Sequence, residues 1–259
     1  MRILAVGDIV GKPGREYIYR NLFAIREKYR IDFVIANGEN SATTNGITPD
    51  IADELVRRGV DVITMGNHTF GAKGSDRALE ENPNIIRPLN YPPEFEGRGW
   101  VTVDTGFAEI AVINLIGRVN MTPADCPFRA VEKLLREIDS DIIAVDIHAE
   151  TTSERLAMGN FLDGKVQIVF GTHTHVQTAD ERILPGGTAY ISDLGMTGIM
   201  DSILGTKKEI IIDYYKSMGK RLRFEKEEHG EVWFNGCIFE IDDKTKKAAG
   251  VRRLRFSDV

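Results

Sequence analysis

Side chains that could bind metal ions follow five short apolar runs in this sequence. Each run is rich in small or branched apolar residues, and each leads to an Asp, Glu, Asn or His. The candidate ligands are Asp8, Glu39, Asn40, Asn67, His148, His173 and His175. Runs of this kind are typical of buried strands. Open α/β sheets bind ligands at the carboxyl ends of their strands, where loops converge, so we predict that these side chains form one site.

The composition of this set indicates the chemistry. It combines carboxylate, amide and imidazole ligands without a thiolate, which favours Mn, Fe, Zn or Co over calcium or a thiolate zinc site. Seven ligands are more than one four- to six-coordinate ion needs, so we predict two ions with Glu39 as the bridging carboxylate. Two ions about 3.5–4 Å apart polarise a phosphoryl group, activate water and stabilise a leaving oxygen. The set therefore predicts phosphoester hydrolysis.

Each candidate has a simpler explanation when it is considered alone. An aspartate at a strand end is usually a helix N-cap, and an asparagine there usually forms a turn with its own backbone. A single glutamate is usually a surface residue, and a single buried histidine usually satisfies a hydrogen bond. The pair His173 and His175 is a stronger indication, because alternate residues of an extended segment point the same way. The coincidence of candidates at five strand ends favours the metal site.

His68 is the candidate proton donor. It follows Asn67 directly, and an unperturbed imidazole titrates near pH 6.5, so its protonated form can donate to a leaving alkoxide. In our hypothesis a hydroxide that bridges the two ions attacks phosphorus in line, and His68 protonates the leaving oxygen. The alternative is that His68 only orients a neighbouring ligand.

The predicted elements alternate between strands and helices along most of the chain. Strands are expected at 3–6, 33–36, 60–64, 109–115, 142–147 and 166–170, and helices at 15–29, 49–58, 127–138 and 153–162. The proline-rich stretch 82–106 predicts a loop that crosses into a second sheet. Further strands are expected at 209–215, 232–241 and 249–256. This order predicts an α/β protein, a two-sheet αββα sandwich, as a single domain over residues 1–259.

Composition narrows the partners and the compartment. The chain has 259 residues, 42% of them hydrophobic, and a formal net charge of -6, which argues against broad binding of extended nucleic acid. A small anion can still bind through metal ions. Cys126 and Cys237 are far apart and form no CxxC pair, which is typical of reduced cytoplasmic thiols. Apolar runs stay well short of the roughly 20 residues that a membrane-spanning helix needs.

Other candidate motifs are weaker. The segment from Gly7 to Pro13 lacks the Ser or Thr of a Walker A loop and has one residue too few between its glycines. Lys12 and Arg15 fit a solvated helix start, with a position near the substrate mouth as the alternative. Cys126 precedes a proline and a helix, which fits a structural turn better than a nucleophile. His229 lies in a charged run and is expected at the surface.

Several motifs resemble those of a known superfamily. Gly66-Asn67-His68 and Gly171-Thr172-His173-Thr174-His175 resemble the third and fifth motifs of the calcineurin-like metallophosphoesterases. Gly7-Asp8 and Gly38-Glu39-Asn40 stand where that superfamily has Asp-x-His and Gly-Asp. Two departures are Val10 in place of His and Glu39 in place of the bridging Asp. These departures, with the stretches 114–118, 125–128 and 193–198, resemble the YmdB-type branch over nearly the whole chain.

This resemblance implies a role for each matching position. It assigns the first ion to Asp8, Glu39, Asn40 and His175. It assigns the second ion to Glu39, Asn67, His148 and His173. Asn40 would fill the place left by the histidine that is absent at position 10, and His68 would be the proton donor. The branch is described as cyclic-nucleotide phosphodiesterases that hydrolyse 2′,3′-cyclic nucleotides with iron or manganese, so we expect those ions, with zinc as an alternative, and 3′-nucleotide products.

Two other functions remain open at this stage. A phosphomonoesterase or nucleotidase would use the same metals, and a regulatory protein could sense a nucleotide without hydrolysing it. The residues also leave open the native metal, the physiological substrate and the subunit count, including a homo-oligomer.

Overall fold

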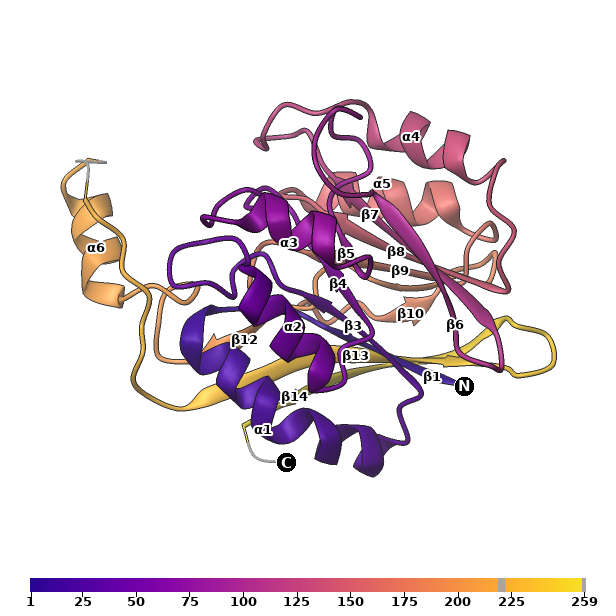
Figure 1. Cartoon of the computed structure of the whole chain (residues 1–259), viewed down its shortest axis with the longest axis horizontal. Helices are drawn as coiled ribbons and strands as arrows, with labels where there is room; N and C mark the ends of the chain where they lie inside the picture. Colours follow the sequence, from indigo (N-terminus) through magenta and orange to yellow (C-terminus); the bar gives the residue numbers. More distant parts are fainter. Residues whose placement is uncertain (219–221, 258–259) are drawn as a thin grey trace.

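Two β-sheets pack face to face, and helices cover their outer surfaces (Figure 1). The computed structural model describes residues 1–218 and 222–257. The first sheet contains β1 (Arg2–Val6), β2 (Asp8–Ile9), β3 (Phe33–Asn37), β4 (Val62–Thr64), β5 (Ile85–Ile86), β12 (Met196–Ile199), β13 (Val232–Ile241) and β14 (Ala248–Phe256). The second contains β6 (Trp100–Asp104), β7 (Glu109–Ile116), β8 (Ile142–His148), β9 (Ile168–Thr172), β10 (Arg182–Ile183) and β11 (Ala189–Ile191). The helices are α1 (Gly11–Tyr29), α2 (Pro49–Arg57), α3 (Ser75–Glu81), α4 (Pro127–Leu134), α5 (Thr152–Leu162) and α6 (Lys208–Lys216).

Strand order explains why the apolar runs are nearly continuous. The first sheet runs β2-β12-β13-β1-β3-β4-β5, with β14 beside β13, and the second runs β10-β11-β9-β8-β7-β6. Strands β1, β3, β4 and β5 are parallel neighbours, as are β7, β8, β9 and β11. Parallel strands covered on both faces have no solvent side, so their sequences do not alternate with polar residues. Their carboxyl ends form one edge in each sheet.

The core has three apolar layers. Ile35, Phe170 and Phe239 belong to the layer between the two sheets. Outside the first sheet, α1 contributes buried residues at helical spacing, among them Ile18 and Leu22. Outside the second sheet, α4 and α5 supply a comparable apolar face. The arrangement confirms the predicted αββα sandwich.

Two regions show where the predictions hold and where they fail. The stretch 82–106 does cross from the first sheet to the second, but it also contributes β5 and β6. The predicted strand at 209–215 is wrong, because these residues form α6. Tyr214 and Tyr215 follow Ile210 and Ile211 at a spacing of four residues, which places each pair on one face of a helix. This helical spacing outweighs the preference of the β-branched isoleucines for a strand. No helix in 1–218 or 222–257 has the length and apolar character that crossing a bilayer requires.

Candidate metal centre

The two sheet edges meet at a buried cluster built around Glu39 and His148. Glu39 Oε1 lies 3.1 Å from His148 Nε2, and the two side chains are at most 1% exposed. His148 Nε2 also lies 2.9 Å from Asn67 Oδ1 and 3.1 Å from His173 Nδ1. Candidate ligand atoms of Glu39, His148 and His173 lie within 4.8 Å of one another. This half of the cluster offers carboxylate, amide and imidazole ligands at the spacing that one ion needs.

The remaining candidates surround Asp8 on the other side of Glu39. Asn40 Nδ2 lies 3.4 Å from both Asp8 Oδ1 and Glu39 Oε1, and 3.2 Å from His175 Nε2. His175 Nε2 is 3.5 Å from Asp8 Oδ1, and the backbone N–H of His173 donates to Asp8 Oδ2. All seven sequence-predicted ligand candidates therefore meet in one cluster, with Glu39 between its two halves.

Local backbone geometry makes this convergence achievable. A Cβ at Gly66 would overlap His148 Cδ2 and Glu39 Oε2, so only glycine fits there. His173 and His175 have φ angles of 111° and 63°, a region that non-glycine residues rarely adopt. Such conformations persist only where the surroundings hold them, and they concentrate at functional sites.

Each of the three histidines makes a hydrogen bond that leaves its other ring nitrogen facing the cluster. His175 Nδ1 lies 3.0 Å from the carbonyl oxygen of Leu204, and His173 Nε2 lies 2.9 Å from Glu150 Oε2. Each of these oxygen acceptors requires a proton on the ring nitrogen that contacts it. The other nitrogens, His175 Nε2 and His173 Nδ1, are therefore available for a cation.

His148 is fixed by a longer chain of hydrogen bonds. Its Nδ1 lies 2.9 Å from the hydroxyl of Thr172, and that hydroxyl donates to Asp146 Oδ1 at 2.8 Å. Because the hydroxyl proton is used on Asp146, Thr172 accepts from the Nδ1–H of His148, and Nε2 faces the cluster. Thr64 donates to the other oxygen of Asp146 at 2.6 Å. Burial raises the pKa of Asp146 to about 7, although His148 and the two hydroxyl donors oppose the shift.

A buried ion pair supports the loop that carries His173 and His175. Arg155 lies 2.9 Å from Asp193 Oδ2, and both side chains are at most 1% exposed. The same carboxylate oxygen accepts from the backbone N–H and the hydroxyl of Thr174, at 3.1 and 2.7 Å. Arg155 also donates to the carbonyls of Ala149 and Thr172. The pair thereby connects the ends of β8 and β9 to the loop between the two histidines.

Electrostatics show a cluster that attracts positive charge. Burial would raise the pKa of Asp8 and Glu39, but neighbouring histidines keep both pKa values below their ordinary range. Burial would likewise lower the pKa of His148, but Glu39 and Asp8 raise it to about 9. Burial and His148 together lower the pKa of His173 to about 4. Asp8 also raises the pKa of His175 against the effect of burial, so protonated His148 and His175 balance the two carboxylates, a role that a bound cation would take over.

His68 lies at the edge of this cluster rather than inside it. Its backbone N–H donates to Glu39 Oε2 at 2.8 Å, and its ring nitrogens lie 3.3 and 3.4 Å from Asn45 Nδ2. Burial lowers its pKa below 6.5, with Glu39 opposing and His148 and Lys226 adding to the shift. The imidazole faces a cavity of about 740 Å³ that Asn40 and His175 also line. His68 therefore lines the same cavity as Asn40 and His175 of the cluster.

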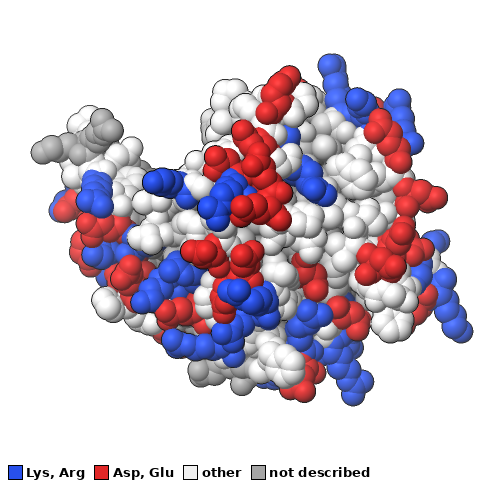
Figure 2. Space-filling view, in the orientation of Figure 1, with Lys and Arg blue, Asp and Glu red and all other residues white. Residues whose placement is uncertain are grey.

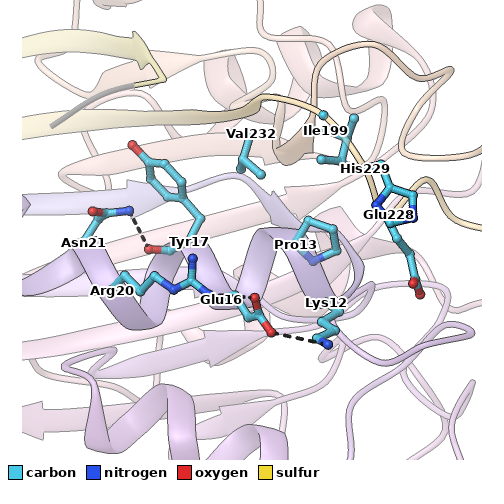
Figure 3. A pocket seen from close by; sticks show the side chains of 11 residues that line it. Lys12, Pro13, Glu16, Tyr17, Arg20, Asn21, Ile199, Glu228, His229 and Val232 are labelled. Carbon is cyan, nitrogen blue, oxygen red and sulfur yellow. Dashed lines mark hydrogen bonds and ion pairs between the residues drawn. The ribbon is translucent and has the colours of Figure 1, made fainter.

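Weaker motif candidates lie elsewhere. A hollow of about 320 Å³ lies over α1, and Lys12 Nζ lies 3.7 Å from Glu16 Oε1 there. Figure 3 shows these two side chains pointing toward each other. None of the seven candidate ligands lines this hollow. Cys126 precedes α4 and lines a separate cavity of about 580 Å³. His229 is exposed, as expected, and borders both the hollow and the 740 Å³ cavity.

Sequence reasoning missed most of the supporting residues. Asp146 could have been found, because it lies two residues before His148 and so shares its face of the strand. Arg155 and Asp193 carried no such signal, since buried ion pairs depend on packing between distant segments. Lys226 was also missed, although its Nζ donates to the backbone carbonyls of Asn40 and Ala42 at 2.6 and 2.8 Å. Its sequence neighbourhood indicates only a charged run.

Known proteins are similar to this sequence over its full length. A 2′,3′-cyclic-nucleotide 2′-phosphodiesterase of Bacillus subtilis is 45% identical over 260 residues, which cover 100% of this chain and 98% of that protein. A sequence model described as YmdB-like protein matches residues 4–254.

Solved structures share the fold equally completely. The crystal structure of a hypothetical protein from Thermus thermophilus superposes with a TM-score of 0.94 at 36% identity, covering 100% of both chains. The crystal structure of a novel phosphatase from Mycoplasma pneumoniae superposes with a TM-score of 0.93 at 37% identity, covering 99% of this chain and 93% of that one. The chain belongs to the YmdB-like protein family.

Proposed function

We propose that this protein is a metal-dependent phosphodiesterase that hydrolyses 2′,3′-cyclic nucleotides to 3′-nucleotides. The observation that carries the proposal is the convergence of three hydrogen-bonded histidines on Asp8 and Glu39 beside the 740 Å³ cavity. The B. subtilis relative supports the substrate class, because its name specifies this reaction. The relationship to a phosphatase of known structure supports phosphoester chemistry.

The donor set fits two divalent transition-metal ions. In this proposal Asp8, Asn40 and His175 hold the first ion, and the second is held by the set Asn67, His148 and His173. Glu39 lies between the two groups and serves both. A half-turn of the Asn40 amide exchanges Nδ2 for Oδ1, the atom that can bind a cation. Nitrogen and oxygen ligands without thiolate suit Fe or Mn, with Zn as the alternative.

The chain's own residues orient the reaction. When bound, the two ions supply the positive charge that polarises a phosphoryl group and lowers the pKa of water. Thr172 and Asp146 hold His148 with Nε2 toward the cluster, and Leu204 holds His175 in the same way. His68 faces the cavity and donates a proton to the leaving oxygen. Its pKa, lowered by burial, leaves a minority of protonated His68 at neutral pH.

A small substrate in the cytoplasm completes the proposal. Lys and Arg side chains are interspersed with Asp and Glu on the face drawn in Figure 2, so that face lacks the continuous basic surface that extended nucleic acid requires. Cys126 and Cys237 are both free thiols, which suits a reducing compartment.

Product analysis with matched variants tests the function. Protein loaded with Mn or Fe is incubated with 2′,3′-cyclic AMP, and we expect 3′-AMP to accumulate without adenosine. Glu39→Gln should abolish turnover and reduce metal content, whereas the exposed Glu94→Gln should change neither. Faster release of phosphate from 3′-AMP than opening of the cyclic ester would identify a phosphomonoesterase instead. Tight nucleotide binding without any product would identify a sensing protein and overturn the proposal.

A further inference from the structure

The 740 Å³ cavity has a second wall that contributes none of the seven ligand candidates of the metal cluster. Residues Leu204, Thr206 and Lys207, which precede α6, line this wall together with residues 223–226, which follow it, and Phe224 is among them. A phosphate group occupies only a small part of such a volume, which lies in the range typical of sites for whole small molecules. The second wall is therefore placed to contact the part of a nucleotide that does not react.

Backbone hydrogen bonds join the two segments of this wall to each other, and side-chain contacts tie the wall to the cluster. Lys207 N–H donates to the carbonyl of Glu225 at 3.0 Å, and Glu227 N–H donates to the carbonyl of Gly205 at 2.9 Å. The wall is tied to the cluster by the bond between His175 and the Leu204 carbonyl. A second link comes from Lys226, which holds the backbone of Asn40. Phe224 and Asn40 line the same cavity, so one bound nucleotide can contact both.

Phe224 is held on one side and open on the other. Its ring packs against Tyr214 of α6 with centroids 5.5 Å apart and planes at 82°, an edge-to-face contact. Nevertheless 54% of its surface is exposed, and it lines the cavity. The helix that supports it lies at one end of the molecule, away from both sheets (Figure 1), and buries none of its own residues. An aromatic ring that is packed on one edge and lines a cavity is suited to a flat aromatic ligand.

We propose that Phe224 stacks on the base of the bound cyclic nucleotide. This inference rests on the function proposed above and adds a base subsite to it. The charged residues of this wall largely balance one another, because Lys207 is ion-paired with Glu225 at 2.9 Å and Glu228 lines the cavity as well as Arg223. The aromatic ring is therefore the feature that favours a base. Stacking reads no hydrogen-bond pattern, so every base has a face that can use it. The subsite therefore selects nucleotides over base-free phosphodiesters without strong preference among the bases.

Substrates with and without a base separate this role from catalysis. The matched pair is 2′,3′-cyclic AMP and methyl riboside 2,3-cyclic phosphate, which carry the same cyclic ester. Phe224→Ala should raise KM for cyclic AMP about tenfold, the lower part of the range measured for base stacking on aromatic side chains. It should leave kcat, and KM for the base-free ester, within about twofold, and Phe224→Trp should retain the wild-type KM. The control Phe107→Ala removes a ring that is 84% exposed outside the cavity and should change nothing.

A binding measurement keeps the inference separate from the proposed reaction. Isothermal titration of the metal-loaded protein with adenosine 3′-phosphate should give a Kd that Phe224→Ala weakens about tenfold, whereas ribose 3-phosphate should bind both proteins equally. If neither cyclic ester is hydrolysed, the proposed function fails while this binding result still decides the subsite. Equal KM increases for both cyclic esters, an unchanged Kd for adenosine 3′-phosphate, or no binding of it to the wild type would each overturn the role of Phe224.

Discussion

The two walls of the cavity differ in how they are supported. The cluster wall includes Asn40 and His175, and behind it Asp8 and His148 have no exposed surface and extend from strands packed between helices and a second sheet. On the opposite wall, Phe224 is 54% exposed and Leu204 is 49% exposed, and α6 beside them has no buried residue. Groups that must keep a fixed geometry therefore belong to the core, whereas groups that contact the rest of a ligand lie on a segment outside it.

The supporting contacts follow the same division. The cluster wall depends on buried hydrogen bonds and an ion pair, which cost several kcal/mol when one partner is removed. The other wall depends on a short backbone pairing and on exposed pairs such as Lys207 with Glu225, which contribute little because water screens them. Substitutions on the two walls should therefore have very different consequences.

The largest effect is expected from removing the buried imidazole of His148 behind the cluster wall. His148→Ala should lower kcat/KM for 2′,3′-cyclic AMP at least about 10³-fold, equivalent to about 4 kcal/mol, because both the ligand and the partner of Glu39 are lost. His229→Ala, on the exposed side of the same cavity, should retain activity within about threefold. Steady-state kinetics and metal analysis of both variants test the contrast. Comparable losses in the two would show that the walls are not functionally distinct.

The next effect concerns the support beneath the histidine loop. Asp193→Asn leaves Arg155 buried without a compensating charge, so we expect the free energy of unfolding to fall by about 3 kcal/mol. The loop with His173 and His175 should also hold metal less tightly, by about 10- to 100-fold, as for other partners of metal ligands. Urea unfolding and metal titration measure the two changes. A variant with wild-type stability would contradict the importance of this ion pair.

A smaller loss is expected at the edge of the cluster. His68→Gln should reduce kcat about 100-fold, the lower end of the range for general acid catalysis. Because the donor must be protonated, the wild-type rate should fall as pH rises through the pKa of His68, and burial places that pKa below 6.5. The descending limb should be absent in the variant. A pH profile of kcat/KM that keeps the same descending limb in His68→Gln would assign the limb to another group and remove the acid role.

The strand ends were predictable because a buried strand and the polar residue that follows it are both visible in a short stretch of sequence. A buried parallel strand needs a continuous apolar run, so the polar residue that follows it marks the edge of the sheet. This reasoning found Glu39 and His148 and the two-sheet architecture. It failed for α6, where β-branched composition suggested a strand that has no neighbouring strand to pair with. Composition alone does not specify whether a pairing partner exists.

The second wall could not be predicted, because its contacts are not local. Lys226 holds the carbonyl of Asn40 across 186 positions of sequence, and the surrounding charged residues are those of an ordinary solvated segment. Phe224 is likewise an isolated apolar residue in that segment. Its position in the cavity follows from the pairing of residues 205–207 with 225–227, and no periodic pattern encodes such a short contact.

The smallest effect is expected on α6 itself. Tyr215→Ala removes a ring that is 74% exposed, so the free energy of unfolding should change by less than about 0.5 kcal/mol. Phe170→Ala, between the sheets, should cost about 3 kcal/mol by comparison. Urea midpoints for the two variants measure how far α6 is independent of the core. A loss above about 1 kcal/mol at Tyr215 that grows with protein concentration would instead indicate that α6 is covered in a homo-oligomer, and the second wall would then be part of an assembled surface.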